Sequence, residues 1–342
     1  MNGFRGFGLS LSNEDPVAVT LALVAEAERL GYDEVSLPES RLFRSVTSVA
    51  AAALVATERI VVRIGIANPV FRNPVVLALE AATLADLGPG RLRFGVGAAD
   101  WTVRALGMEP EGWLPFTNTV EAITAIRRLT AGETLGFVPD TFDASADLRL
   151  DLPTAPVPVD VGAVNRRMME ASGEHADGVQ LGAITSVGYT RWATARLAEG
   201  ARRAGRTVDE LLVSANVLTS VDRDRRAART AIRPVLAYYL ARVEGVVVTE
   251  SGADPAAVEA VRAAVSEHGV EAGAAAISEE LIDVFAAAGT VDDVVAALAP
   301  FADAGLDLPL MWYTFGPDQA ESIRVLAEQV RPAVVTRRDE AR

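Results

Sequence analysis

The chain has 342 residues, half of them hydrophobic, and its 46 acidic against 32 basic residues give a formal net charge of −14. This acidic balance argues against general nucleic-acid binding, because neutralising phosphates needs clustered cations. Cysteine is absent, which excludes disulfides and is compatible with the cytosol, and no apolar run approaches the about 18 residues of a membrane span, so we expect a cytoplasmic protein with no membrane contact.

Strand and helix signals alternate along the chain with little between them. The first helix illustrates the pattern, since Asp15 can cap it, Pro16 fits its first turn and Gly31 ends it. The expected strands are 4–11, 34–37, 60–67, 92–96, 157–161, 178–181, 211–219 and 306–313. The expected helices are 16–30, 45–57, 74–87, 116–130, 166–173, 187–203, 291–304 and 317–330.

Eight strand–helix units predict an α/β protein with the fold of a (βα)8 TIM barrel, in a single domain over residues 1–335. Two segments depart from a minimal barrel. Residues 132–156 are rich in Asp, Pro and Thr and are expected to form an excursion loop. Residues 222–288 are Ala-rich and predict a helical insertion before the last βα unit. A doubly wound open sheet is the alternative, but no G-x-G-x-x-G follows the first strand.

In such a barrel the chemistry lies at the carboxyl ends of the strands. Reading those ends gives a mixed polar and aromatic ring: Ser10, Glu39, Asn68, Asp100, the segment 162–166, Gly182, Ala183, Asn216, Trp312 and Tyr313. The only two histidines, His175 and His268, lie elsewhere, so neither a metal site nor a histidine-based mechanism is expected.

Each of these rim signals has an ordinary structural interpretation as well. Asp100 could cap the segment that follows it, and Glu39 could pair with Arg41 or Arg44. The small residues of 162–166 open a helix and could bind an anion, or Asn165 could simply be its N-cap. Thr290 with Asp293 approximates a capping box. From the residues alone these alternatives remain open.

A set of short motifs, each weak alone, spans nearly the whole chain in a fixed order. They are 31–35 (GYDEV), Glu39, 65–69 (GIANP), 72–74 (RNP), 84–87 (LADL), 90–91 (GR), 94–100 (FGVGAAD), 106–107 (LG), 168–173 (MMEASG), 176–179 (ADGV), 285–290 (FAAAGT) and 315–318 (FGPD). In this order they resemble the luciferase-like monooxygenase superfamily, and within it the coenzyme F420-dependent branch typified by methylenetetrahydromethanopterin reductase.

The resemblance implies a bacterial luciferase-like barrel with a flavin-like ring bound over the strand ends. It implies a non-prolyl cis peptide bond between Gly65 and Ile66, and Asp100 and Glu39 as catalytic residues. The implied cofactor-binding residues are Ser10, Gly65, Ile66, Ala67, Asn68, Gly97, Gly162, Ala163, Val164, Asn165, Arg166, Gly182 and Ala183. The sequence departs from the family at Ser40, where many relatives have His, and at Ser10, where the methanopterin reductases have Glu.

The leading hypothesis is therefore hydride transfer between coenzyme F420 and a small organic substrate. The alternatives are an FMN-dependent luciferase-like monooxygenase and a non-catalytic flavin-binding barrel. Arginines of the expected rim loops are predicted to neutralise the anionic cofactor tail: Arg41, Arg44, Arg72, Arg166 and Arg167. A homodimer is expected, because dimers are common in the family that the motifs resemble.

Overall fold

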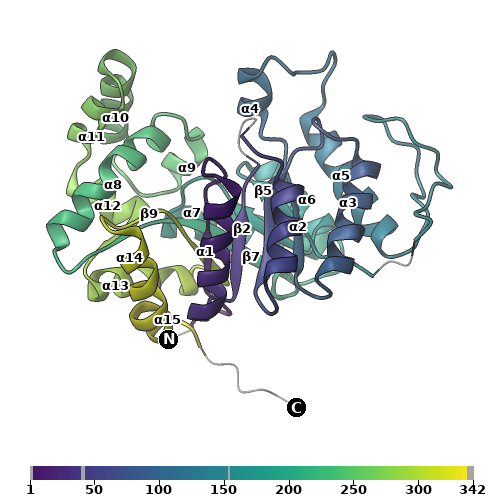
Figure 1. Ribbon diagram of the computed structural model, residues 1–342. Coiled ribbons are helices and arrows are strands. Elements are labelled where there is room, and N and C mark those ends of the chain that lie inside the picture. Colours follow the sequence, from purple (N-terminus) through teal and green to yellow (C-terminus); the bar gives the residue numbers. More distant parts are fainter. Residues whose placement is uncertain (1–2, 40–42, 153–154, 337–342) are drawn as a thin grey trace.

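Figure 1 shows the computed structural model of the chain, which describes residues 3–39, 43–152 and 155–336. Eight parallel strands close a barrel in which β1 pairs with both β2 and β9, and β6 pairs with β7. The barrel strands are β1 (Gly8–Ser10), β2 (Glu34–Leu37), β3 (Val61–Ala67), β4 (Leu92–Val96), β5 (Val159–Ala163), β6 (Gly178–Leu181), β7 (Leu212–Val221) and β9 (Leu308–Phe315). The predicted (βα)8 architecture is confirmed.

Helices connect successive strands and cover the outside of the barrel (Figure 1). They are α1 (Val17–Leu30), α2 (Val46–Ala56), α3 (Pro74–Leu87), α5 (Pro115–Thr130), α6 (Arg166–His175), α7 (Val187–Arg203), α13 (Val291–Asp303) and α14 (Gln319–Val325), with the short α4 (Asp100–Ala105) and α15 (Arg331–Val334). Gly31 ends α1 with φ 83°, a left-handed conformation that favours glycine. Among the described residues, no helix is both long and apolar enough to cross a membrane.

Several strand boundaries differ from the sequence prediction, most notably those of β5 and β1. Strand β5 begins at Val159 rather than at residue 157, because Pro158 has no N–H to donate to a neighbouring strand. The carbonyl oxygen of Pro158 accepts a hydrogen bond from Phe94 N at 2.9 Å. Strand β5 also extends two residues further than predicted, to Ala163. Gly162 and Ala163 thus belong to the strand and not to the loop after it. Strand β1 is shorter than expected, and Phe4 instead forms an isolated bridge with Val335.

The insertion is helical as expected, but its end is not. It comprises α8 (Arg225–Leu240), α9 (Gly245–Thr249), α10 (Pro255–His268), α11 (Val270–Ala276) and α12 (Glu279–Phe285). Residues 286–288, predicted as part of the helical insertion, form the short strand β8 (Ala286–Gly289), which pairs in parallel with the last residues of β7. In 132–156, the described residues form no helix or strand, which agrees with an excursion loop.

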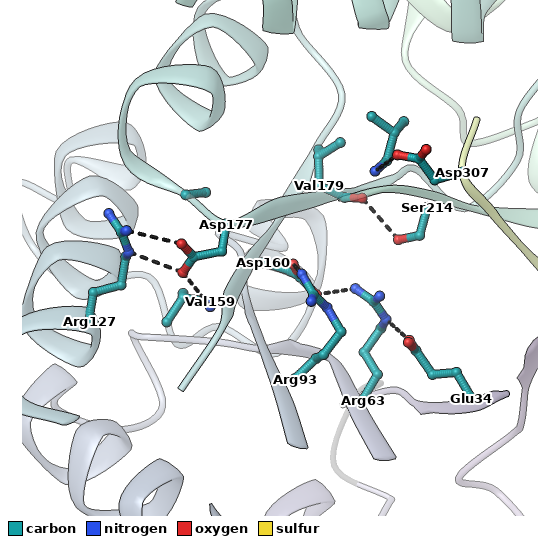
Figure 2. A network of polar contacts seen from close by, with 12 residues as sticks. Glu34, Arg63, Arg93, Arg127, Val159, Asp160, Asp177, Val179, Ser214 and Asp307 are labelled. Carbon is teal, nitrogen blue, oxygen red and sulfur yellow. Dashed lines mark hydrogen bonds and ion pairs between the residues drawn. The ribbon is translucent and has the colours of Figure 1, made fainter. Parts of the chain in front are cut away.

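The barrel interior carries a charged network (Figure 2). Arg63, fully buried on β3, pairs with Glu34 of β2 and with Asp160 of β5, and Arg93 of β4 donates to Asp160 Oδ1 at 2.5 Å. Burial opposes the charge of Asp160, but the two arginines outweigh it and hold the pKa of that carboxyl below its usual value. Burial raises the pKa of Glu34. The network occupies the barrel below the strand ends.

Candidate functional site

The ring of inward-facing positions at the strand ends has two unlike halves. On one side the side chains are polar or aromatic and almost fully buried: Ser10, Ser36, Gln180, Asn216 and Trp312. On the other side, β3, β4 and β5 carry Gly65, Gly95 and Gly162. The site therefore has a wall rich in hydrogen-bonding groups and a facing wall whose inward strand positions are glycines.

The side chain of Ile66 fills the glycine half. The peptide bond between Gly65 and Ile66 is cis, as the family resemblance implies. A Cβ on Gly95 would lie 2.9 Å from Ile66 Cγ2, one on Gly97 would lie 2.8 Å from Cδ1, and one on Gly162 would lie 3.2 Å from Cγ1. The approaches at Gly95 and Gly97 are closer than real side chains show, and the one at Gly162 is tight, so the three glycines form the seat in which the bulge of β3 rests.

Gly65 packs directly against side chains of the polar half of the ring. A Cβ there would collide with Ser36 Oγ and with Gln180 Oε1. Both oxygens are buried without a hydrogen-bond partner among the described residues, while Gln180 Nε2 donates to Asn216 Oδ1 at 3.3 Å. Polar atoms without a partner in the described part of the chain thus lie directly beside the bulge.

Glu39, predicted to be catalytic, is held by other groups. Its carboxylate accepts from Arg72 Nη1 at 3.0 Å and from Arg72 Nη2, and from the backbone N–H of Asn68 at 3.0 Å. The Glu39 side chain is only 7% exposed, and Arg72 is also paired with Glu80 at 3.6 Å. This geometry suits a carboxylate that fixes the segment after β3.

Asn68 extends that clamp to the segment after β4. Its Nδ2 donates to the carbonyl oxygen of Ala98 at 2.6 Å, and its Oδ1 accepts from Val70 N at 2.7 Å. Ala99 then adopts a left-handed conformation with φ 40°, and Asp100 is the first residue of α4. Asn68 thereby ties the turn that presents Asp100 to the end of β3.

Asp100 is the more open of the two predicted catalytic acids. Its side chain is 48% exposed, and the Arg104 guanidinium lies 3.9 Å away. A carboxylate that is this exposed can contact a ligand in the mouth of the barrel. The Glu39 carboxylate is less available, because it is bound by Arg72 and by Asn68 N.

The segment after β5, predicted to bind the cofactor phosphate, is built as a helix start. Asn165 Oδ1 accepts from Met168 N at 3.1 Å, so the N-cap interpretation is confirmed. The Val164 carbonyl oxygen accepts from the hydroxyl of Tyr189 at 2.8 Å. Gly182 and Ala183 follow β6, next to β5 in the barrel, and Ala183 is exposed. The capping box of Thr290 and Asp293 is confirmed as well.

The arginines predicted to neutralise a cofactor tail have protein partners. Arg44 donates to the carbonyl oxygens of Asn13 and Glu14, and Arg166 pairs with Glu170 at 2.6 Å. Arg72 binds Glu39 as described, and the Arg167 guanidinium lies 3.7 Å from the centre of the Phe116 ring. Arg41, like Ser40, lies outside the described residues.

The sequence analysis missed Ser36 and Gln180. Both lie inside short strands, whereas the prediction considered only residues that follow the strands. The signal that could have found them is a lone polar residue between two apolar ones, as in Val35-Ser36-Leu37 and Val179-Gln180-Leu181. Over the described part of the chain, no three His, Asp or Glu side chains converge as metal ligands would.

Comparison with known proteins assigns this architecture to a family. The family model described as luciferase-like monooxygenase matches residues 3–308. The chain belongs to the luciferase-like monooxygenase family. A 5,10-methylenetetrahydromethanopterin reductase of Methanolobus tindarius is 28% identical over 95% of this chain and 99% of its own length. An F420-dependent glucose-6-phosphate dehydrogenase of Beutenbergia cavernae is 32% identical over 62% of this chain and 67% of its own length.

Among solved structures, the coenzyme F420-dependent tetrahydromethanopterin reductase of Methanopyrus kandleri superposes with a TM-score of 0.88. It is 24% identical and the match covers 97% of this chain and 99% of that one. At this identity the superposition establishes the shared fold, including the closed barrel.

Proposed function

We propose that the protein is an oxidoreductase that uses coenzyme F420 and transfers hydride between this deazaflavin and a small organic substrate. Relatives named as F420-dependent glucose-6-phosphate dehydrogenases support the cofactor. The observation that carries the proposal is the bulge at Gly65–Ile66, seated on glycines and facing a polar wall, with Asp100 at the same end of the barrel.

The residues present fit a flat ring with one polar edge. Ile66 offers an apolar surface that the glycine seat holds in place. Beside it, Ser36 and Gln180 have oxygens to which no residue that the structure describes donates a hydrogen bond. We assign the ring to Ser10, Gly65, Ile66, Ala67, Asn68 and Gly97, and the phosphate to Gly162, Ala163, Val164, Asn165, Arg166, Gly182 and Ala183. When bound, coenzyme F420 would supply two-electron hydride chemistry, whereas the protein supplies placement and electrostatics.

We assign different roles to the two acids. Asp100 is partly open to solvent and its ion pair with Arg104 is long, at 3.9 Å, so it is the group that can hold or move a proton at the substrate. Glu39 is bound by Arg72 and by Asn68 N, so it positions the segment after β3 rather than exchanging protons. Asn68 acts in the same way on the turn before Asp100.

Titration of the purified protein with each cofactor separately tests the proposal. We expect coenzyme F420 to bind, with a change in its absorbance and fluorescence, and FMN to bind more weakly. Tight FMN binding without F420 binding would favour a monooxygenase and overturn the proposal. Failure of both to bind would favour a barrel with another ligand.

The substrate is a second question, because Ser10 replaces an acidic residue of the methanopterin reductases. Methylenetetrahydromethanopterin and glucose 6-phosphate, which the names of the relatives specify, are the first compounds to assay with F420. Turnover of a compound, followed by the change in deazaflavin absorbance, identifies the substrate class.

We also propose a homodimer formed through α2 and α3, two helices that pack side by side. Both expose large apolar side chains on the outside of the barrel: Val55, Val76, Leu79 and Leu87. Such a patch is typical of a protein interface. Sedimentation of the wild type should give twice the chain mass of 36.1 kDa, and Leu79→Glu should shift it towards one chain. A monomeric wild type would contradict the dimer.

A further inference from the structure

The insertion contributes an aromatic side chain to the mouth of the barrel. The ring of Tyr239, near the end of α8, contacts the ring of Trp312, with centroids 4.8 Å apart and planes inclined by 48°. Trp312 lies on β9 in register with Ser10 of β1 and Leu218 of β7, at one of the inward-facing positions of the strand ends. Tyr239 therefore packs over the carboxyl end of the barrel, against a residue of the candidate site.

The protein holds the Tyr239 ring in a defined position. The neighbouring ring of Tyr238 meets it edge-on, with centroids 5.1 Å apart and planes inclined by 82°. Directly after Tyr239, Arg262 of α10 donates to the carbonyl oxygens of Leu240 and Val243 at 3.0 and 2.9 Å, which ties the end of α8 to α10. An aromatic surface that is already ordered loses little entropy when a ligand packs on it.

Tyr239 and Trp312, together the aromatic wall, lie across the barrel from Asp100. Between β9 and β4 the barrel has β1, β2 and β3 on one side and β7, β6 and β5 on the other, so these two strands are opposite one another. Asp100 follows β4 as the first residue of α4, and Trp312 lies in the second half of β9. A substrate bound over the strand ends thus has a carboxylate on one side and an aromatic surface on the other.

The charges at the mouth disfavour an anionic substrate. The Asp100 side chain is 48% exposed, and the chain as a whole carries a formal net charge of −14. Three arginines of the rim already bind acceptor groups of the protein. Arg44 donates to backbone carbonyl oxygens, Arg72 binds a buried carboxylate, and Arg104 is shared between Asp100 and Glu109. These contacts favour an uncharged molecule.

We propose that Tyr239 and Trp312 set the substrate class: an uncharged compound whose reacting carbon is attached to a flat ring, which packs on the aromatic wall. This rests on the proposed F420-dependent reaction. Benzaldehyde is the simplest probe of the class. Its carbonyl carbon accepts a hydride from the reduced deazaflavin, which is left oxidised, and its oxygen accepts a proton, so that the carbon–oxygen double bond becomes single and benzyl alcohol forms. Contacts between aromatic rings strengthen such binding by about two- to tenfold.

Binding to the wall is tested without turnover, using benzyl alcohol and reduced coenzyme F420, a pair that cannot react. Saturation-transfer NMR on the full-length protein should show transfer to the ring protons of benzyl alcohol. Tyr239→Leu should weaken the affinity by about two- to tenfold, whereas Tyr239→Phe, which keeps the ring, should retain it. The control Trp192→Leu removes one ring of another aromatic pair, Tyr189 and Trp192 on α7, and should bind as the wild type does. No transfer to the wild type, or equal affinity in Tyr239→Leu, would overturn the proposal.

Selectivity in the F420 assay gives a second test. The wild type should reduce benzaldehyde with a higher kcat/KM than propanal, and Tyr239→Leu should raise the KM for benzaldehyde by about two- to tenfold while that for propanal stays nearly the same. Equal losses for both aldehydes, or a higher kcat/KM for glucose 6-phosphate than for benzaldehyde, would contradict the proposal. Failure of F420 to bind, or no turnover of any compound, would count against the proposed reaction, whereas the NMR measurement, repeated without F420, would still decide whether the wall binds a ring.

Discussion

The side-chain amide of Asn68 donates a 2.6 Å hydrogen bond to the carbonyl oxygen of Ala98, two residues before Asp100. The backbone N–H of the same asparagine donates to Glu39, which Arg72 holds in turn. Three neighbouring strands, β2, β3 and β4, are thereby connected at their carboxyl ends through polar contacts. The position of Asp100 depends on residues that do not themselves touch it.

Asn68→Ala removes the link between β3 and the turn that presents Asp100. We expect kcat with F420 to fall by about ten- to a hundredfold, because small displacements of a catalytic group are costly, while the affinity for F420 changes less. Asn73→Ala is a matched control, since Asn73 lies in the same loop but caps α3 through a 2.9 Å bond to Val75 N. It should cost about 1 kcal/mol of stability and leave kcat unchanged. Equal kcat losses in the two variants would contradict the link.

The glycine seat predicts coupling between Gly162 and Ile66. Gly162→Ala brings a Cβ to within 3.2 Å of the Ile66 side chain and should destabilise the protein by about 1–3 kcal/mol in urea unfolding. In the background of Ile66→Ala the neighbour is removed, so the same substitution should cost much less. Additive effects in this double-mutant cycle would show that the two residues do not interact.

Asn165→Asp distinguishes the role of Asn165 as the N-cap of α6 from its proposed role in binding the cofactor phosphate. Aspartate caps a helix as well as asparagine does, so the unfolding free energy should stay within about 0.5 kcal/mol of the wild type. The added negative charge should weaken F420 binding at least several-fold, and more so at low salt, as measured by fluorescence titration. Asn165→Ser keeps the cap without the charge and should bind F420 as the wild type does. Wild-type affinity in Asn165→Asp would place the phosphate elsewhere.

The buried network predicts acid sensitivity through Asp160. Its native pKa is held below the ordinary value by Arg63 and Arg93, so it contributes stability above about pH 4 and this contribution is lost as the pH falls through the native pKa. Asp160→Asn should cost about 3–5 kcal/mol near neutrality, and the difference from wild type should shrink as the pH falls below about 4. The exposed Asp143→Asn is the control and should match the wild type at each pH.

Glu34 changes the stability with pH in the opposite direction to Asp160. Because wild type and Asp160→Asn both contain Glu34, the difference in stability between them reports on Asp160. Burial raises the pKa of Glu34, so the native state favours its protonated form, and its effect on stability becomes less favourable as the pH rises through that pKa. A difference between wild type and Asp160→Asn that stays constant from pH 7 to pH 3 would contradict the assignment to Asp160.

Local patterns predicted much of the fold. Alternating periodicity and capping residues gave the eight units, and Asn165 and Thr290 cap their helices as their neighbours in sequence suggest. Strand β8 was missed because three successive alanines, Ala286 to Ala288, suit a helix as well as a strand. What decides it is the free edge at the end of β7, a partner far away in the sequence.

The site was predicted less completely than the fold. Glu39 was correctly placed at the rim, but its partner Arg72 is 33 residues away and sequence gives no measure of their distance. Ser36 and Gln180 face Gly65 only because β3 bulges there.

The pairing of β8 with β7 also bears on how this enzyme type could diversify. The insertion leaves the barrel after Val221 and returns through β8, whose partner is again the end of β7, so both of its ends are anchored on one strand. The eight barrel strands keep their register whatever the length of α8 to α12. Helices from a related chain could be grafted between these two anchor points, which makes this segment a natural place to re-engineer which molecules the barrel accepts.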